Sequence, residues 1–230
     1  MFVKSLKLIG FRNYIEADIE FSAAKTIIIG KNAQGKSNLL EVIQILSHLK
    51  SRRAAKDAEL INFNLEQSIV QAVIKVKGEG ATSSDSDDEI KEIGLLLRKS
   101  GRRTVKINDV PKKPKELLHH IYSVAFMVDD IEIITGNPAR RREWLDSVIS
   151  QLNLSYENDL TKFEKILSQR NSFLKDLTAK GIYHYNNFNA AQREELAIWD
   201  TMYIEAANPL SRARAEFIQG LEPHAAHYYQ

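Results

Sequence analysis

The chain has 230 residues, a formal net charge of +2 and no cysteine, which excludes a disulfide framework and a thiolate metal site. Hydrophobic residues make up 43% and charged residues 27%, as in an ordinary folded domain. No apolar run is long enough to cross a bilayer, so we expect a cytoplasmic protein with no membrane segment. A net charge this small does not by itself indicate nucleic-acid binding.

The first part of the chain is predicted to be rich in β-structure. Five strands are expected, at residues 2–9, 14–21, 69–77, 89–98 and 104–107. The first two form an antiparallel pair, and so do the next two. The second pair is joined by the glycine-, serine- and aspartate-rich segment 78–88, which we expect to be a solvated loop.

A phosphate-binding motif, G-x-x-x-x-G-K-[ST], lies between the two pairs. It consists of Gly30, Lys31, Asn32, Ala33, Gln34, Gly35, Lys36 and Ser37. Residues 26–29 before it predict a short buried strand, and residues 38–49 after it predict a helix. Backbone N–H groups at a helix N-terminus bind phosphate, while the motif's lysine reaches the β and γ phosphates and its serine holds Mg²⁺. We therefore expect a nucleoside triphosphate to bind here, with Lys36 and Ser37 in these roles.

The character of the chain changes near Pro138, where helical patterns begin. Three helices are predicted: one through Trp144, a longer one through Phe163, and a third that opens at Asn189 with a reciprocal N-cap. Pro209 is expected to bend or restart the third helix. The simplest organisation is an ATP-binding lobe at residues 1–136 followed by a helical arm at residues 137–230.

The expected sheet has too few strands next to the phosphate motif. A P-loop strand needs parallel neighbours, and the chief candidate for one is residues 121–128. The helical pattern of the arm continues to about Gly220, and no further strand of the sheet is predicted after it. These observations predict a truncated chain.

Five segments, taken in order, resemble the RecF family, bacterial gap-repair ATPases related to the SMC and ABC-type ATPases. They are residues 6–14 (LKLIGFRNY), 30–41 (GKNAQGKSNLLE), 49–61 (with LKSRR and DAELI), 136–146 (GNPARRREWLD) and 168–175 (SQRNSFLK). The resemblance covers nearly the whole chain and is far more specific than the P-loop alone. It implies an α/β fold: the first part of an ABC-type ATPase head, with an antiparallel β subdomain, followed by a helical arm called lobe II.

The resemblance also implies the site and the partners. ATP and Mg²⁺ are expected at the P-loop, with Arg12 and Asn13 touching the nucleotide from the turn after the first strand. The family binds gapped or duplex DNA at single-strand junctions when loaded with ATP, forms an ATP-dependent homodimer, and works with a RecR-type mediator in recombinational repair and SOS induction. Its F-x-P-x-D segment corresponds to residues 126–130, where Val128 replaces the proline.

Two family elements are not found in the sequence: the ABC signature and a late Walker B strand, which together support the weak DNA-dependent ATPase of the full-length family. We therefore assign no catalytic residue and expect ATP binding without useful turnover. In an alternative hypothesis, residues 124–130 form a Walker B strand of a self-contained P-loop NTPase, with Asp129 on Mg²⁺ and Asp130 or Glu132 orienting water. A third hypothesis is a degenerate product with an incomplete fold.

Basic residues are grouped along the chain and are candidates for contact with DNA. They are Arg52, Arg53, Arg98, Lys99, Arg102, Arg103, Lys106, Lys112, Lys113, Lys115, Arg140, Arg141 and Arg142. A DNA backbone would be attracted to such groups, but solvated hairpin faces are the commoner role of charge runs. The sequence leaves these two alternatives open.

Overall fold

The computed structural model describes residues 1–22, 25–77 and 88–229. The chain divides into two compact units, Met1–Phe126 and Met127–Gln230. The domain boundary expected at residues 136–137 remains a prediction. Of the loop expected at residues 78–88, residues 78–87 lie outside the described residues, and Asp88 is the first residue of a strand.

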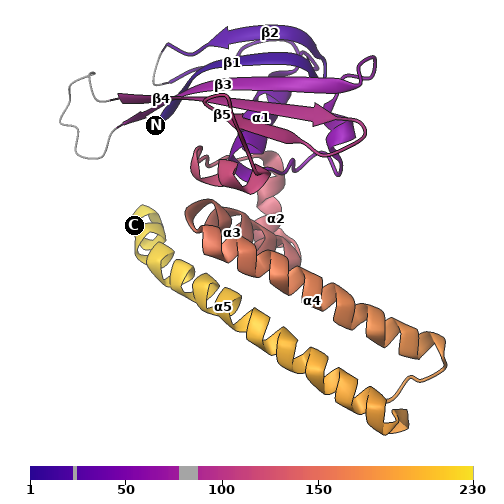
Figure 1. Cartoon of the computed structure of the whole chain (residues 1–230). Coiled ribbons are helices and arrows are strands. Elements are labelled where there is room, and N and C mark those ends of the chain that lie inside the picture. Colours follow the sequence, from indigo (N-terminus) through magenta and orange to yellow (C-terminus); the bar gives the residue numbers. More distant parts are fainter. Residues whose placement is uncertain (23–24, 78–87, 230) are drawn as a thin grey trace. The chain divides into compact units, whose positions relative to one another are not determined.

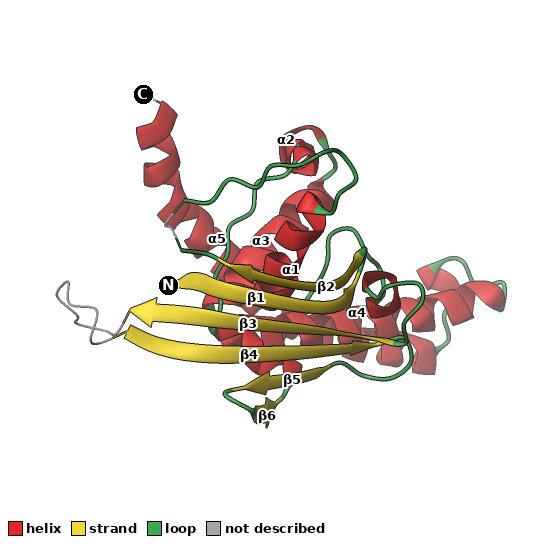
Figure 2. Cartoon of the chain, turned by 90° about the horizontal axis from the view of Figure 1, so that it is seen from above, coloured by secondary structure: helices red, strands yellow, loops and turns green. Residues whose placement is uncertain are grey.

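The first unit contains a six-stranded antiparallel sheet. Its strands are β1 (Phe2–Phe11), β2 (Tyr14–Glu20), β3 (Gln67–Lys77), β4 (Asp88–Arg98), β5 (Thr104–Ile107) and β6 (Val110–Lys112). Seen from above, they lie in the order β2-β1-β3-β4-β5-β6 (Figure 2). Both predicted pairs are therefore confirmed, and β3 joins them by pairing with β1.

Strand β6 was not predicted, because it is three residues long and contains a proline. It is formed by a two-residue hairpin, since Ile107 lies opposite Val110. Asn108 and Asp109 between them have φ values of 49° and 61°. Asparagine and aspartate tolerate this left-handed backbone, which a tight hairpin with the correct twist requires.

Helix α1 (Lys36–His48) packs its apolar residues against one face of the sheet (Figure 1). Alternate strand residues point into the same core, for example Leu6 and Leu8 of β1 and Leu95 and Leu97 of β4. Two short 3-10 helices, η1 (Asp57–Leu60) and η3 (Pro114–His119), add Leu60 and Leu117 to this core. The predicted helix after the phosphate motif is thus confirmed, and the sheet is the surface against which it packs.

The strand predicted immediately before the phosphate motif is wrong. Residues 25–30 form no strand, and Ile27 and Ile29 are 84% and 88% exposed. The candidate parallel strand at residues 121–128 is also wrong: Val124 and Phe126 are 99% and 92% exposed, and a 3-10 helix, η4 (Val128–Ile131), begins at its end. An apolar run becomes a strand only when a neighbour satisfies its backbone, and within the described ranges every sheet pairing is antiparallel and uses other residues.

The second unit is helical. It contains η4 followed by α2 (Glu132–Thr135), α3 (Pro138–Leu152), α4 (Leu154–Ala179), η5 (Tyr185–Asn187) and α5 (Ala190–Tyr229). Helices α4 and α5 run side by side (Figure 1). Asn137 and Asn153 cap α3 and α4 by accepting N–H bonds from the first turn. The helical arm expected after Pro138 is therefore present.

A partly buried polar triad joins three helices of this unit. Arg214 of α5 donates to both carboxylate oxygens of Asp146 of α3 at 2.8 Å, and the hydroxyl of Tyr156 of α4 also donates to Asp146. Burial, together with the bond to Asp146, raises the pKa of Tyr156. The tyrosine therefore stays protonated and keeps its role as donor.

The start of α5 follows the prediction, but the expected restart at Pro209 does not occur. The Asn189 N–H donates to Gln192 Oε1 and the Gln192 N–H donates to Asn189 Oδ1, both at 2.9 Å, which confirms the reciprocal cap. Pro209 does not restart the helix, which runs on to Tyr229; a bend at this residue remains a prediction. Proline removes the bond to the carbonyl four residues earlier, and that residue, Glu205, is exposed to solvent.

Gly10 provides a test of the backbone geometry in this fold. Its φ is +66°, and a Cβ there would lie 2.7 Å from Leu65 Cδ1 and 2.9 Å from the Gln67 carbonyl oxygen. Gly10→Ala is expected to lower the free energy of unfolding by about 2–4 kcal/mol, from backbone strain and overpacking. Urea denaturation followed by circular dichroism measures this. Gly94→Ala in β4 is the control, with an expected change below about 1 kcal/mol because its Cβ would make only an ordinary 3.7 Å contact; equal effects would contradict the prediction.

Candidate functional site

The phosphate motif forms one continuous loop that leads into α1. Gly35 is the N-cap residue of the helix, with φ +97°, and Ala33 has φ +62°. No side chain caps the helix at Gly35, so the helix begins with its backbone N–H groups and the positive end of its dipole next to the loop. This is the arrangement that the motif predicts for binding an anion.

Lys36 adds a positively charged side chain to the loop. Its Nζ donates to the carbonyl oxygens of Gly30 and Lys31, both at 2.7 Å. The ammonium group therefore lies at the start of the loop, while the lysine backbone belongs to the first turn of α1. Ser37, the predicted Mg²⁺ ligand, is exposed in the same turn. The structure thus brings together all eight motif residues named from the sequence, from Gly30 to Ser37.

The turn between β1 and β2 supports the loop from one side. The Tyr14 hydroxyl donates to the Gly35 carbonyl oxygen at 3.2 Å. A Cβ on Gly35 would lie 2.7 Å from both terminal atoms of the Asn13 side chain. Asn38 Nδ2 in turn donates to Asn13 Oδ1 at 2.8 Å. The positive φ therefore favours glycine at position 35, and a larger residue there would also displace the Asn13 side chain.

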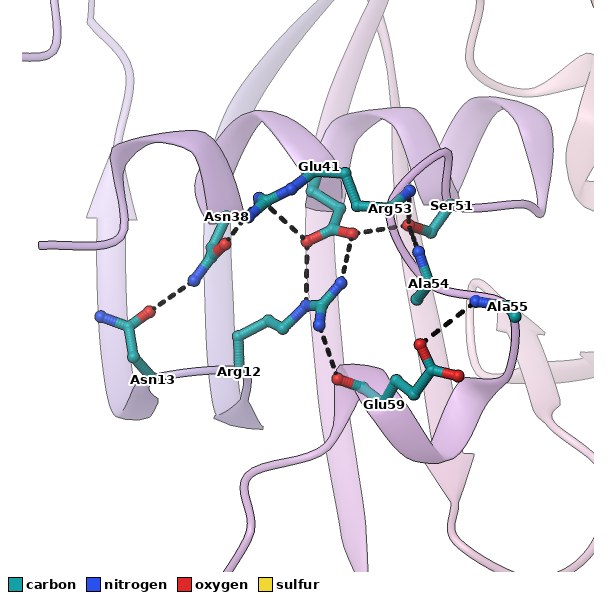
Figure 3. Close-up of polar contacts among 9 residues, drawn as sticks. All are labelled: Arg12, Asn13, Asn38, Glu41, Ser51, Arg53, Ala54, Ala55 and Glu59. Carbon is teal, nitrogen blue, oxygen red and sulfur yellow. Dashed lines mark hydrogen bonds and ion pairs between the residues drawn. The ribbon is translucent and has the colours of Figure 1, made fainter. Parts of the chain in front are cut away.

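Arg12 makes a bidentate ion pair with Glu41 of α1 (Figure 3). Its Nε and Nη2 atoms lie 3.0 and 2.7 Å from the two carboxylate oxygens, and Nη1 donates to the Glu59 carbonyl oxygen at 2.8 Å. The structure therefore directs the Arg12 side chain to protein partners. Its expected contact with a nucleotide, like that of Asn13, remains a prediction.

Glu41 was missed by the sequence analysis as a site residue. Its side chain is 0% exposed. Besides Arg12, the carboxylate accepts a 2.5 Å bond from the Ser51 hydroxyl and lies 3.7 Å from Arg53 Nη1. Arg53 also donates to Asn38 Oδ1 at 2.9 Å. The available signal was an acidic residue within the apolar stretch 39–46 of the predicted helix, because a charge in that setting needs partners from elsewhere in the chain.

The other end of α1 is held by Arg103. Its Nη1 donates to the carbonyl oxygen of Leu49, the C-cap residue, at 2.5 Å. Its Nε and Nη2 atoms donate to Asp57 at 3.0 and 2.5 Å. Arg103 was grouped with the candidate DNA-contacting residues, but the structure gives it these internal partners. A cation at the C-terminal end of a helix is also favourable for the dipole.

Several other basic residues from the predicted clusters form ion pairs within their own unit. Lys99 lies 3.2 Å from Glu66, Lys112 lies 3.5 Å from Glu116, and Arg140 lies 3.0 Å from Glu132 and 3.2 Å from Glu143. These pairs are exposed and contribute little to stability. They reduce the positive charge that the sequence groupings suggest, so contact with DNA stays a prediction for each group.

The alternative Walker B hypothesis lacks the strand on which it depends. Residues 121–127 are not a strand, and Val128–Ile131 form a 3-10 helix. Asp130 Oδ2 accepts the Met127 N–H at 2.6 Å and so belongs to its own turn. The side chain of Asp129 lies outside the described part of the chain.

In the described ranges no helix combines the length and apolarity that a membrane span needs.

Comparison with known proteins decides the family. The profile of the RecF/RecN/SMC N-terminal domain matches residues 2–195. The chain belongs to this family. The match extends from β1 through the P-loop into α5, so it covers the candidate site completely.

The chain is similar along its whole length to curated RecF proteins. The DNA replication and repair protein RecF of Cyanothece sp. is 37% identical and that of Gloeobacter violaceus 36% identical, and each match covers 100% of this chain and 56% of the relative. The chain therefore spans about half the length of these relatives. The resemblance to RecF that the sequence indicated is confirmed.

Solved structures agree on the fold. The recombination mediator protein RecF-ATPrS of the RecFOR pathway superimposes with a TM-score of 0.80 at 32% identity, over 96% of this chain and 55% of that one. The corresponding RecF-ATP structure gives 0.79 at 32% identity, over 95% and 54%. The predicted α/β ATPase-head fold, with its antiparallel sheet and helical arm, is thereby confirmed.

A histidine at the end of α1 makes the stability of the first unit depend on pH. Burial lowers the pKa of His48 and the nearby charge of Arg52 lowers it further, while the Gln44 carbonyl oxygen acts in the opposite direction. Its Nδ1 lies 2.8 Å from Ser47 Oγ. Because the pKa is lower in the folded state than in the unfolded one, the unfolded state binds more protons below about pH 6.5. Stability is therefore complete above that pH and is lost as the pH falls toward the folded pKa.

We expect the free energy of unfolding to fall between pH 7 and pH 5.5, and His48→Gln to reduce that slope. Denaturant titrations at a series of pH values measure it. Burial also lowers the pKa of His120, so His120→Gln is the matched variant, and the double variant should show the smallest slope. An unchanged slope in His48→Gln would contradict the assignment.

Proposed function

We propose that this chain binds ATP with Mg²⁺ at its P-loop, as the nucleotide-binding part of a DNA replication and repair protein of the RecF type. The observation that carries the proposal is the loop itself: a left-handed Gly35 begins α1, and the Lys36 ammonium lies at the start of the same loop. The similarity to the solved structures of RecF-ATPrS and RecF-ATP supports the choice of nucleotide.

The residues present fit a triphosphate. At Gly35 there is no side chain, and the backbone at the start of α1 can approach a phosphate closely, with the helix dipole favouring its charge. The Lys36 ammonium now donates to two loop carbonyls, and it would exchange these for phosphate oxygens, which bind a cation more strongly than carbonyl groups do. The exposed Ser37 hydroxyl would hold the Mg²⁺ that accompanies ATP.

We propose no catalytic residue in this chain and expect it to bind ATP without efficient hydrolysis. The whole protein is proposed to act in the cytoplasm, where ATP drives its dimerisation on gapped or duplex DNA and a RecR-type mediator joins it. Recombinational repair and SOS induction are the proposed outcomes. Support comes from the relatives, which are named as DNA replication and repair proteins, and from the RecFOR description of the solved structures.

Lys36→Ala tests the nucleotide site. The variant should bind Mg-ATP about 10- to 150-fold more weakly, which corresponds to the 1.5–3 kcal/mol lost with charged hydrogen bonds. Isothermal titration calorimetry measures the affinity, and circular dichroism should show an unchanged fold because the Lys36 bonds are exposed. Lys31→Ala is the control, since it removes a positive charge from the same loop but leaves the Lys36 ammonium group in place. Wild-type affinity in Lys36→Ala would exclude the proposed site.

Salt dependence tests the proposed contact with DNA. Binding to a gapped duplex in the presence of Mg-ATP should weaken steeply between 50 and 200 mM salt, with a logarithmic slope of about −0.9 for each phosphate neutralised. Fluorescence anisotropy with a labelled duplex measures this, and an ungapped duplex of equal length shows whether the junction matters. A flat response would exclude phosphate contacts by this chain.

A further inference from the structure

A buried carboxylate lies beside the phosphate loop and has partners on two other segments. Among the described residues that are classed as buried, Glu41 is the one with a charged side chain. Its partners are Arg12 in the β1–β2 turn and Ser51 and Arg53 in the segment after α1. A buried charge is costly unless it is paired and hydrogen-bonded, so these contacts must form together.

The contacts of Glu41 form a closed ring, which can be followed in Figure 3. Arg53 lies between Glu41 and Asn38, and Asn38 donates to Asn13. Asn13 follows Arg12 directly in the sequence, and the ion pair between Arg12 and Glu41 closes the ring. The direction of these bonds is fixed by Arg53: because arginine only donates, Asn38 must present its oxygen to Arg53 and its amide N–H₂ to Asn13.

One member of the ring, Asn13, lies against the backbone of the phosphate loop. Asn13 lies so close to Gly35 that a Cβ there would be 2.7 Å from its amide group, and Tyr14 next to it donates to the Gly35 carbonyl oxygen. Gly35 is the N-cap residue, and its left-handed conformation aims the first N–H groups of α1. The position of Asn13 therefore constrains the part of the loop that would face a phosphate.

We propose that Glu41 is a positioning residue of the phosphate site. Through Arg12 on one side and through Arg53 and Asn38 on the other, it fixes Asn13 and so keeps Gly35 and the first turn of α1 in the binding conformation. Its effect on a ligand rests on the proposed function, but its effect on the loop does not.

A residue that only stabilised the fold would behave differently. The Asp57–Arg103 pair supplies the comparison, because it is also a bidentate ion pair in the first unit and holds the opposite end of the same helix. Asp57→Asn should lower stability without changing the loop. Glu41→Gln keeps the shape of the side chain but removes its charge, so it should loosen both Arg12 and Arg53.

The first experiment measures hydrogen exchange in the ligand-free chain. The amides of Asn38 and Leu39, which donate to the Gly35 carbonyl oxygen, should exchange about tenfold faster in Glu41→Gln than in the wild type, the change expected when a charged hydrogen bond that supports the loop is lost, while Asp57→Asn leaves them unchanged. Asn38→Ala, at a position outside the core, breaks the ring in its middle and should reproduce the effect even if Glu41→Gln folds poorly. Unchanged exchange in Asn38→Ala, or equal acceleration in Asp57→Asn, would overturn the proposal.

The second experiment measures Mg-ATP affinity by calorimetry in the same variants. Glu41→Gln and Asn38→Ala should each weaken binding about tenfold, and the double variant should be no weaker than the stronger single effect, because both break one ring. A lower melting temperature with unchanged affinity in Glu41→Gln would overturn the proposal. If the wild type and Lys36→Ala both fail to bind Mg-ATP, the proposed function fails, and the exchange experiment alone decides the role of Glu41.

Discussion

The ion pair between Arg12 and Glu41 is the interaction on which the first unit depends. It joins the turn of a β-hairpin to the helix that follows the phosphate loop, across 29 positions of sequence. Glu41 is out of contact with water, so its charge must be balanced by the protein. Arg12 does this with two parallel bonds, a geometry that lysine could not supply. The sheet, the helix and the loop between them are thereby held in a single arrangement.

This arrangement explains how a loop with few bonds of its own keeps a demanding conformation. Gly35 and Ala33 both have left-handed backbones. Glycine adopts this region without a steric cost, whereas for Ala33 it costs free energy and persists only where the surroundings impose it. The hairpin turn supplies that constraint through Tyr14 and Asn13, and Arg103 secures the far end of the helix at Leu49. The loop is thus placed by rigid elements on each side, as a site for a charged ligand requires.

Much of this unit could be predicted from local patterns. Alternating residues gave the paired strands, and the spacing of apolar residues gave α1, because both patterns reflect which face is buried. The motif from Gly30 to Ser37 could be assigned from its letters alone. The strand expected at residues 26–29 could not be judged in this way, since a strand depends on neighbours that no local pattern specifies. The same is true of Glu41 and Arg103, whose partners are distant in sequence. In the second unit, Pro209 lies within a continuous helix, which the presence of a proline does not predict.

The pairing of β1 with β3 has a consequence for how the chain folds. Ile9 lies opposite Ile69, so the phosphate loop, α1 and η1 all belong to the long connection that this pairing closes. The β1–β2 hairpin is local and can form early, whereas the centre of the sheet must wait for a segment some sixty residues later. Because closing a long flexible connection costs entropy, an already folded α1 shortens the part that remains to be ordered. On a ribosome, the sheet could therefore be completed only after the whole phosphate-binding segment had been synthesised, and the site would take its final form at the same moment as the core beneath it.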